Sequence, residues 1–131
     1  MNRVIIAAVV LVVVFLAGFL PQYIKANRLD NELRQARQGN ASAELRDLAA
    51  LAYVQANAKN YGLAAATTTR FFNRVREVAN LTADPNSKKA LENLLVSRDK
   101  VTAELAKGDA GVMSDLQELF TKTRQVTGVE Q

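Results

Sequence analysis

Cysteine, histidine and tryptophan are absent from this 131-residue sequence, and aromatic residues make up only 6% of it. Without cysteine or histidine there can be no disulfide, thiolate nucleophile, imidazole base, zinc finger or histidine-ligated haem. The sequence also lacks the glycine-rich patterns G-x-G-x-x-G and G-x-x-x-x-G-K, which bind phosphate groups. We therefore expect no catalytic, cofactor-binding or metal-binding residues and no enzymatic activity.

A long apolar run stands near the amino terminus. Val4 to Leu20 contains neither a charge nor a hydrogen-bonding side chain, and a helix from Val4 to Ile24 would be about 30 Å long, the hydrocarbon thickness of a bilayer. A cleaved secretory signal is the alternative, because Met1-Asn2-Arg3 forms a short positive segment before the run. No small-x-small pair marks a cleavage site, so the pattern favours a retained anchor over residues 1–24.

Charged and aromatic residues flank the run. We expect the membrane-interface residues to be Arg3 on one side and Tyr23, Lys25 and Arg28 on the other. The basic residues after the run would place the carboxyl-terminal domain in the cytoplasm, whereas a short tail before an anchor commonly leads to translocation of the domain after it. We predict a single-pass protein of a bacterial inner membrane, with its carboxyl-terminal domain on the periplasmic side.

The basic surplus of the chain lies close to the anchor. The net charge is +4, yet residues 41–131 carry twelve Lys/Arg against eleven Asp/Glu. Nucleic-acid binding requires a concentrated basic surface, so we expect no nucleic-acid partner.

Residues 25–40 are predicted to form a helical stalk with a thin apolar seam. Five apolar residues recur there and just before it at intervals of two to four: Ile24, Ala26, Leu29, Leu33 and Ala36. The seam could pack on the carboxyl-terminal domain or on a second copy of the chain. Gly39-Asn40 is expected to end the stalk helix.

Residues 41–131 show a period near 3.6 and no convincing alternation, which predicts an all-α domain of four helices in two hairpins. The helices are expected over about 42–58, from 63 to about 80, from 87 to about 106, and from 112 to the glycine at 128. The first apolar face should comprise Leu45, Leu48, Leu51, Ala52 and Val54, and the second Leu63, Thr67, Phe71, Val75 and Val78. Similar segments begin at Val54 and Val101, which suggests the hypothesis of a duplicated hairpin.

The first hairpin resembles a tetratricopeptide-type repeat. The resemblance covers residues 45–78 and depends on small and apolar residues around an interhelical turn, namely Leu48, Leu51, Ala52, Tyr61, Ala64 and Phe71. Departures from the repeat pattern are Gln55, Lys59, Thr68 and Arg76. The resemblance implies a protein-binding scaffold, with a partner helix or peptide lying across the hairpin.

Three residues of this hairpin are candidate partner contacts: Tyr61, Arg70 and Arg74. Each also has a structural interpretation, since a tyrosine can close a hairpin turn and arginines can border a packing face. Asp115 and Glu118 could share a metal ion, but Lys122, four residues after Glu118, makes an ordinary helix-face ion pair more plausible.

The function that these patterns favour is a membrane-anchored accessory or scaffold protein that acts by protein–protein contact. Its expected partners are the lipid bilayer and either a protein in a membrane complex or a second copy joined through the stalk; no small-molecule substrate is evident. The alternative is a membrane-anchored ligand-sensing or lipid-contacting bundle, in which small residues from Ala64 to Thr69 would line a pocket.

Overall fold

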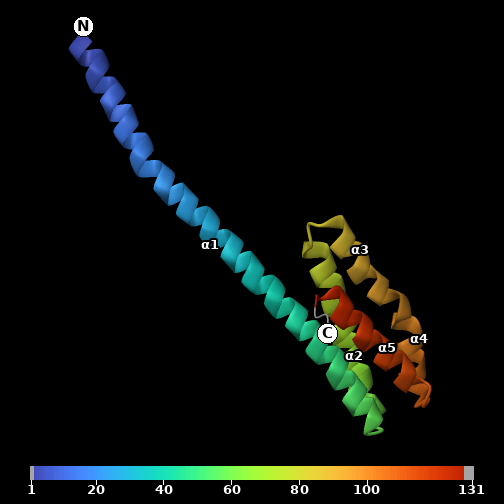
Figure 1. The fold of residues 1–131 in the computed structure, drawn as a ribbon. Helices are drawn as coiled ribbons and strands as arrows, with labels where there is room; N and C mark the ends of the chain where they lie inside the picture. The colour runs from blue at the N-terminus through green and yellow to red at the C-terminus, as the bar shows by residue number, and fades with distance from the viewer. Residues whose placement is uncertain (1, 129–131) are drawn as a thin grey trace. The chain divides into compact units, whose positions relative to one another are not determined.

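The computed structural model describes residues 2–128, apart from the side chains of Phe19, Leu20 and Tyr23. Over this range the chain contains α-helices, one 3₁₀ turn and no strand, which confirms the all-α prediction (Figure 1). The elements are α1 (Asn2–Asn57), α2 (Tyr61–Leu81), α3 (Pro85–Leu94), η1 (Leu95–Ser97), α4 (Arg98–Lys107) and α5 (Val112–Val126).

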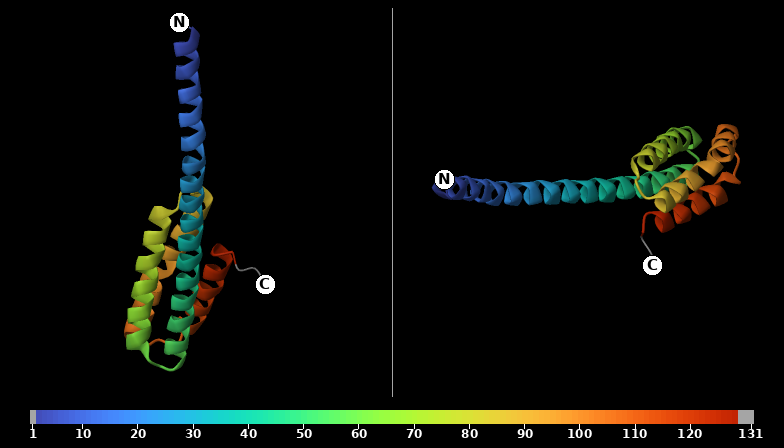
Figure 2. Two further views of the ribbon diagram at one scale, coloured as in Figure 1. Left: turned by 90° about the vertical axis from the view of Figure 1, so that its left-hand side faces the viewer. Right: turned by 90° about the horizontal axis from the view of Figure 1, so that it is seen from above.

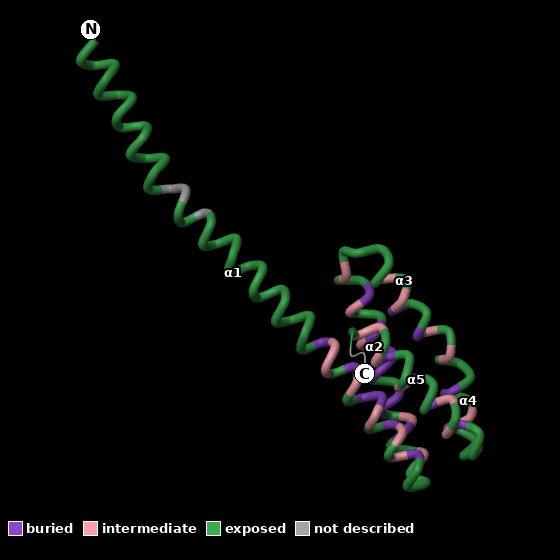
Figure 3. The backbone as a smooth tube through the Cα atoms, viewed as in Figure 1, coloured by how far each residue is buried: buried purple, intermediate pink, exposed green. Residues whose placement is uncertain are grey.

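The chain divides into two units, Met1–Gly39 and Asn40–Gln131. The described part of the first unit is helical, and its described side chains are all exposed, whereas buried positions gather in the second unit (Figure 3). Among the residues described, no helix has the combination of length and hydropathy that crossing a membrane requires. Phe19 and Leu20 of the predicted anchor, and Tyr23 of the predicted interface, lie outside the residues whose side chains are described.

The predicted end of the stalk helix at Gly39-Asn40 is wrong, because α1 continues through both residues to Asn57. A single glycine within a helix costs only about 1 kcal/mol relative to alanine. The hydrogen bonds of the helical turns before and after Gly39 can offset that cost, since no proline directly follows Gly39-Asn40.

α1 also contains a proline, Pro21, within its length.

In the second unit, the last part of α1 packs with the other four helices around one core. One interrupted helix, made of α3, η1 and α4 in succession, packs beside α2 and α5 (Figures 1 and 2). The largest fully buried side chains come from every helix of the unit: Leu45, Phe71, Phe72, Val75, Leu94, Val101, Val112 and Leu116. The rings of Phe71 and Phe72 meet edge to face, with centroids 5.2 Å apart.

Capping residues set two of the helix starts. The Asn60 side chain accepts a hydrogen bond from the Leu63 backbone N–H at 3.5 Å, so α2 begins at Tyr61 and the turn is shorter than expected. Asp84 accepts hydrogen bonds from the backbone and the hydroxyl of Ser87 at 2.9 and 2.7 Å. Pro85 occupies the first position of α3, where its missing N–H removes no helical bond.

The predicted third helix is interrupted, which the sequence pattern did not indicate. Leu95–Ser97 form a 3₁₀ turn, and the Ser97 hydroxyl donates to the Leu94 carbonyl at 3.2 Å. A serine hydroxyl that bonds to a nearby carbonyl competes with regular helix geometry. The segment contains neither glycine nor proline, so it carries no strong breaker signal.

The expected apolar faces of the first hairpin were partly wrong. Leu51 and Val54 of α1 and Leu63 of α2 are 44%, 61% and 53% exposed. Alanines take part of the buried face of α1 instead, at positions that are three to four residues apart: Ala49, Ala52 and Ala56. Their small side chains let the neighbouring helix approach closely. With the alanines on the buried face, Val54 lies on the opposite, exposed side of α1.

Candidate functional site

The most extensive exposed apolar surface is the described part of the amino-terminal run. Every large apolar side chain from Val4 to Leu16 is between 51% and 75% exposed. Of the predicted interface residues, Arg3, Lys25 and Arg28 are also exposed on α1. Consecutive apolar residues cover all sides of a helix, so this surface has no separate polar face.

Tyr61 is half-buried at the first position of α2 and packs against the core. Its ring lies beside the backbone of Gly108, where an added Cβ would be 3.5 Å from Tyr61 Cδ2. Tyr61 thus connects the turns of both hairpins at one end of the second unit. This position beside both turns fits a tyrosine that closes the hairpin. Because Tyr61 is half-buried, only part of its side chain is accessible to a partner.

The two candidate arginines of α2 differ. Arg74 is held between Glu44 of α1 and Glu77 of α2, with Nε–Oε2 and Nη1–Oε2 distances of 2.8 and 2.9 Å. The hydrogen bond with Glu77, together with Glu44, raises the pKa of Arg74. Arg70 is exposed. Arg74 therefore joins the two helices of the hairpin, while Arg70 is open to contact.

The segment expected to line a ligand pocket is only partly packed against the rest of the unit, since Ala66 and Thr69 are exposed. Ala64, Thr67 and Thr68 are at most 5% exposed. The Thr67 hydroxyl lies 2.6 Å from Gln55 Oε1 on α1, and the Thr68 hydroxyl donates to the Ala64 carbonyl at 2.7 Å. These hydroxyls are satisfied within the protein and do not point to a bound ligand.

A charged cluster that the sequence pattern did not indicate connects α4 to α5. Lys100 Nζ lies 3.0 and 2.8 Å from the two carboxylate oxygens of Asp115, donating a hydrogen bond to Oδ1, and 3.8 Å from Glu104 Oε1. Among the described residues, Glu104 Oε2 and Asp115 Oδ2 are buried side-chain oxygens that accept no hydrogen bond. A proton on Glu104 that is donated to Asp115 would satisfy both oxygens.

The pKa values of the two carboxyl groups move in opposite directions. The hydrogen bond with Asp115, followed by burial, raises the pKa of Glu104 above its ordinary value of 4.5. The Lys100 ammonium and then the hydrogen bond from Glu104 lower the pKa of Asp115 below 3.8. Lys100 has a raised pKa because Asp115 stabilises its charged form. Glu104 therefore takes up a proton at a higher pH than Asp115 does.

This cluster has a sequence signal that could have revealed it. Glu104 and Asp115 stand at equal distances from the middle of the turn between α4 and α5. Antiparallel helices bring such positions together.

The predicted ordinary pair of Glu118 with Lys122 is confirmed, with an Oε1–Nζ distance of 2.5 Å. Over the described residues, no group of three or more potential metal ligands occurs.

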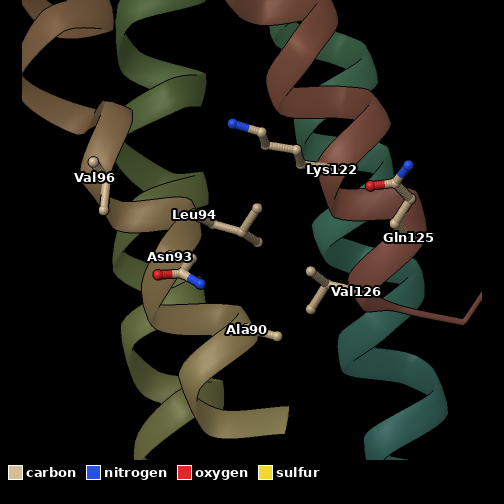
Figure 4. Close-up of a pocket in the computed structure, with 7 residues that line it drawn as sticks. All are labelled: Ala90, Asn93, Leu94, Val96, Lys122, Gln125 and Val126. Atoms are coloured by element: carbon tan, nitrogen blue, oxygen red, sulfur yellow. The ribbon is translucent and has the colours of Figure 1, made fainter. Parts of the chain in front are cut away.

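A surface groove of about 420 Å³ lies between α3–η1 and α5. Figure 4 shows Leu94 and Val126 reaching into it from opposite sides, with Lys122 near one end. A smaller hollow of about 150 Å³ lies beside the charged cluster, along Lys100 and Asp115. The lining of the groove mixes apolar residues with the polar side chains of Asn93, Lys122 and Gln125. Small-molecule sites are predominantly apolar, with a small number of precisely placed polar groups.

Comparison with known proteins adds no assignment: no family model matches the chain, and no curated protein or solved structure is significantly similar to it.

Proposed function

We propose that this chain is a single-pass, membrane-anchored accessory or scaffold protein. Residues 1–24 form the anchor, residues 25–40 form a juxtamembrane helix, and the helical unit after them acts by contacting another protein. The bacterial inner membrane is the proposed location.

The observation that carries the proposal is the exposure of the apolar run on all sides of α1. Eleven large apolar side chains between Val4 and Leu16 are each more than half exposed. Each costs about 1.5–3 kcal/mol when it stays in water rather than being buried. In the sequence the run continues through Phe19 and Leu20 without a charge. A helix that is apolar on every side is typical of a membrane span or of the core of a large protein, and lipid covers all of its sides at once.

The residues around the run support the same proposal. Pro21 lies inside α1, where it would cost about 3 kcal/mol in an isolated helix in water; proline is more frequent in helices that span membranes. Lys25 and Arg28 are exposed immediately after the run. Each could add about 1 kcal/mol of attraction to an anionic lipid surface.

The contact function is supported by the surface of the first hairpin. Leu51, Val54 and Leu63 are exposed although the core of the unit is filled by other apolar residues. Contiguous exposed apolar patches are typical of protein-contact surfaces, and Leu51 and Val54 lie three residues apart, on one face of α1. Arg70 is exposed on the same hairpin and adds a charged contact.

Carbonate extraction of membranes that contain the full-length chain tests the anchor. We expect the native chain to stay in the pellet and Leu11→Arg together with Val14→Arg to move it to the supernatant, because each arginine costs about 2.5–3.5 kcal/mol near the centre of a spanning helix. Gln35→Arg with Gln38→Arg is the matched control and should leave the chain in the pellet. Extraction of the native chain would refute the anchor.

Photo-crosslinking in intact cells tests the contact surface. A photoreactive residue at Val54 or Leu63 should give a discrete adduct with another protein. The matched control is Val96, which is apolar and 81% exposed but belongs to η1. No adduct at either hairpin position, or equal adducts at Val96, would contradict the proposed surface.

A further inference from the structure

The juxtamembrane part of α1 carries an apolar seam that nothing in its own unit covers. Leu29 and Leu33 are 59% and 51% exposed, and Ala26 and Ala36 are exposed as well. The four residues are separated by three, four and three positions. This spacing is that of the a and d positions of a heptad, which line the contact between two coiled helices.

The charges beside the seam are arranged as a second copy would require. With Ala26 at an a position, Lys25 and Glu32 occupy g positions, and Asp30 and Arg37 occupy e positions. In a parallel coiled coil, each g residue faces the e residue five positions further along the other helix. Lys25 then faces Asp30 of the second copy, and Glu32 faces Arg37 of the second copy. Both pairs are attractive, and two-fold symmetry repeats each of them.

The part of the chain that the structure describes offers these four charges no ion-pair partner. Among the described residues, no ion pair involves any of the four side chains, and all four are exposed. The residues at the intervening f positions, Asn31 and Gln38, are uncharged. Opposite charges therefore flank the apolar seam where they can contact another helix.

We propose that residues 22–39 form a parallel, in-register, two-stranded coiled coil with the same segment of a second copy of this chain. The inference rests on the proposed membrane anchor for its strength and direction. Eighteen residues are fewer than three heptads, and isolated helices of this length are only marginally stable in water. Two anchors in one membrane hold the segments parallel and raise their effective concentration.

Disulfide crosslinking tests the seam without background, because the chain has no cysteine. The full-length variants Ala26→Cys and Ala36→Cys place a small thiol on the seam, and Asn31→Cys and Gln38→Cys are controls on the opposite face. After mild oxidation of native membranes, we expect seam variants to form roughly five times more disulfide-linked dimer than the controls. Equal crosslinking on both faces, or none at the seam, would overturn the proposal.

Charge reversal tests the register. In the Ala36→Cys background, Glu32→Lys places the introduced ammonium against Arg37 of the second copy, and Arg37→Glu places two glutamates together. Each variant alone should form roughly five- to ten-fold less dimer than the parent. Co-expression of the two, tagged differently, should restore crosslinking between unlike chains. In the mixed dimer, the introduced lysine faces the introduced glutamate, and the native Glu32 of one chain faces the native Arg37 of the other. Both contacts are attractive, whereas each self-pair has two like-charge contacts, so the mixed dimer is favoured over either self-pair. Failure of the mixed dimer to exceed both self-pairs would refute the parallel register.

Carbonate extraction of the same membranes separates the two proposals. A chain that stays in the pellet but shows no preference for seam crosslinking contradicts the coiled coil and leaves the anchor standing. A chain that is extracted contradicts the anchor; seam-specific dimers in that supernatant would still support pairing of the helices.

Discussion

The two hairpins of the helical unit turn in the same way with different residues. In the first, Lys59 has a φ of 60°, its N–H bonds to the Ala56 carbonyl at 2.9 Å, and Asn60 N–H bonds to the Gln55 carbonyl at 2.9 Å. The second repeats this arrangement. Gly108 has a φ of 64° and bonds to the Leu105 carbonyl at 3.2 Å, and the next N–H, of Asp109, bonds to the Glu104 carbonyl at 2.9 Å. Both turns are Schellman motifs with a left-handed residue after the helix.

The shared turns do not extend to shared packing. Val54 and Val101 begin the similar segments of the two hairpins, yet Val54 is 61% exposed and Val101 is fully buried. Phe72 is buried. Phe120, which aligns with it at a spacing of 48 residues when a one-residue insertion is allowed in the second hairpin, is half-buried under the guanidinium of Arg124. Schellman motifs end a large share of all helices, so the common turn follows from helix geometry and does not by itself require duplication.

The largest expected difference between the hairpins is at the paired phenylalanines. Phe72→Ala should lower the free energy of unfolding by about 3–5 kcal/mol, since it leaves a cavity in the filled core. Phe120→Ala should cost only about 1–2 kcal/mol, because the ring is already partly in contact with solvent. Denaturant unfolding of both variants measures the difference. Equal losses would show that the two positions are equivalent in packing after all.

The next difference is at the left-handed residue of each turn. Gly108→Ala should destabilise the unit by about 1–2 kcal/mol, since a Cβ is strained at this φ, even though its nearest neighbour, Tyr61 Cδ2, would be at an ordinary contact distance of 3.5 Å. Lys59→Gly should stabilise it by about 0.5–1 kcal/mol by removing the same strain. Thermal unfolding checks both signs, with Gly62→Ala as a control in the right-handed helical region. A loss of stability in Lys59→Gly would contradict the equivalence of the turns.

Some of this architecture could be predicted from local sequence. Asp84-Pro85 indicated a helix stop and start, and Asp84 does cap α3. The apolar residues recur with a period near 3.6, which predicts the all-α fold class correctly, because this period reflects the helical geometry of each segment by itself. The continuation of α1 through Gly39 and the break at Leu95–Ser97 depend on small differences in helix energy, which a single sequence does not resolve.

The packing details depend on contacts between helices, which local patterns do not contain. Leu51 and Val54 were expected in the core because they are large and apolar, but the close approach of another helix selects the alanines of α1 instead. The sequence places Tyr61 beside Gly62 at a turn, but the glycine that its ring covers is Gly108 of the other hairpin. Both cases involve residues that are distant in sequence.

The smallest expected effect is the pH dependence of the charged cluster in the second hairpin. Glu104 has a raised pKa in the folded chain, so its contribution to stability is complete below the ordinary value of 4.5 and is lost as the pH rises through the raised value. The lowered pKa of Asp115 acts in the opposite sense: its contribution is present above 3.8 and is lost as the pH falls through the lowered value. The stability contributed by the pair should therefore be greatest in mildly acidic solution and decline towards neutrality.

Glu104→Gln isolates this effect, because an amide can donate to Asp115 at any pH as the protonated carboxyl does. We expect the variant to lose the decline between mildly acidic and neutral pH and to be at least as stable as the parent at pH 7. Glu92→Gln, at an exposed position of α3, should keep the parental profile. The measurement is the melting temperature of each chain from pH 4 to 8. A parental slope in Glu104→Gln would mean that the pH dependence comes from groups outside this hairpin.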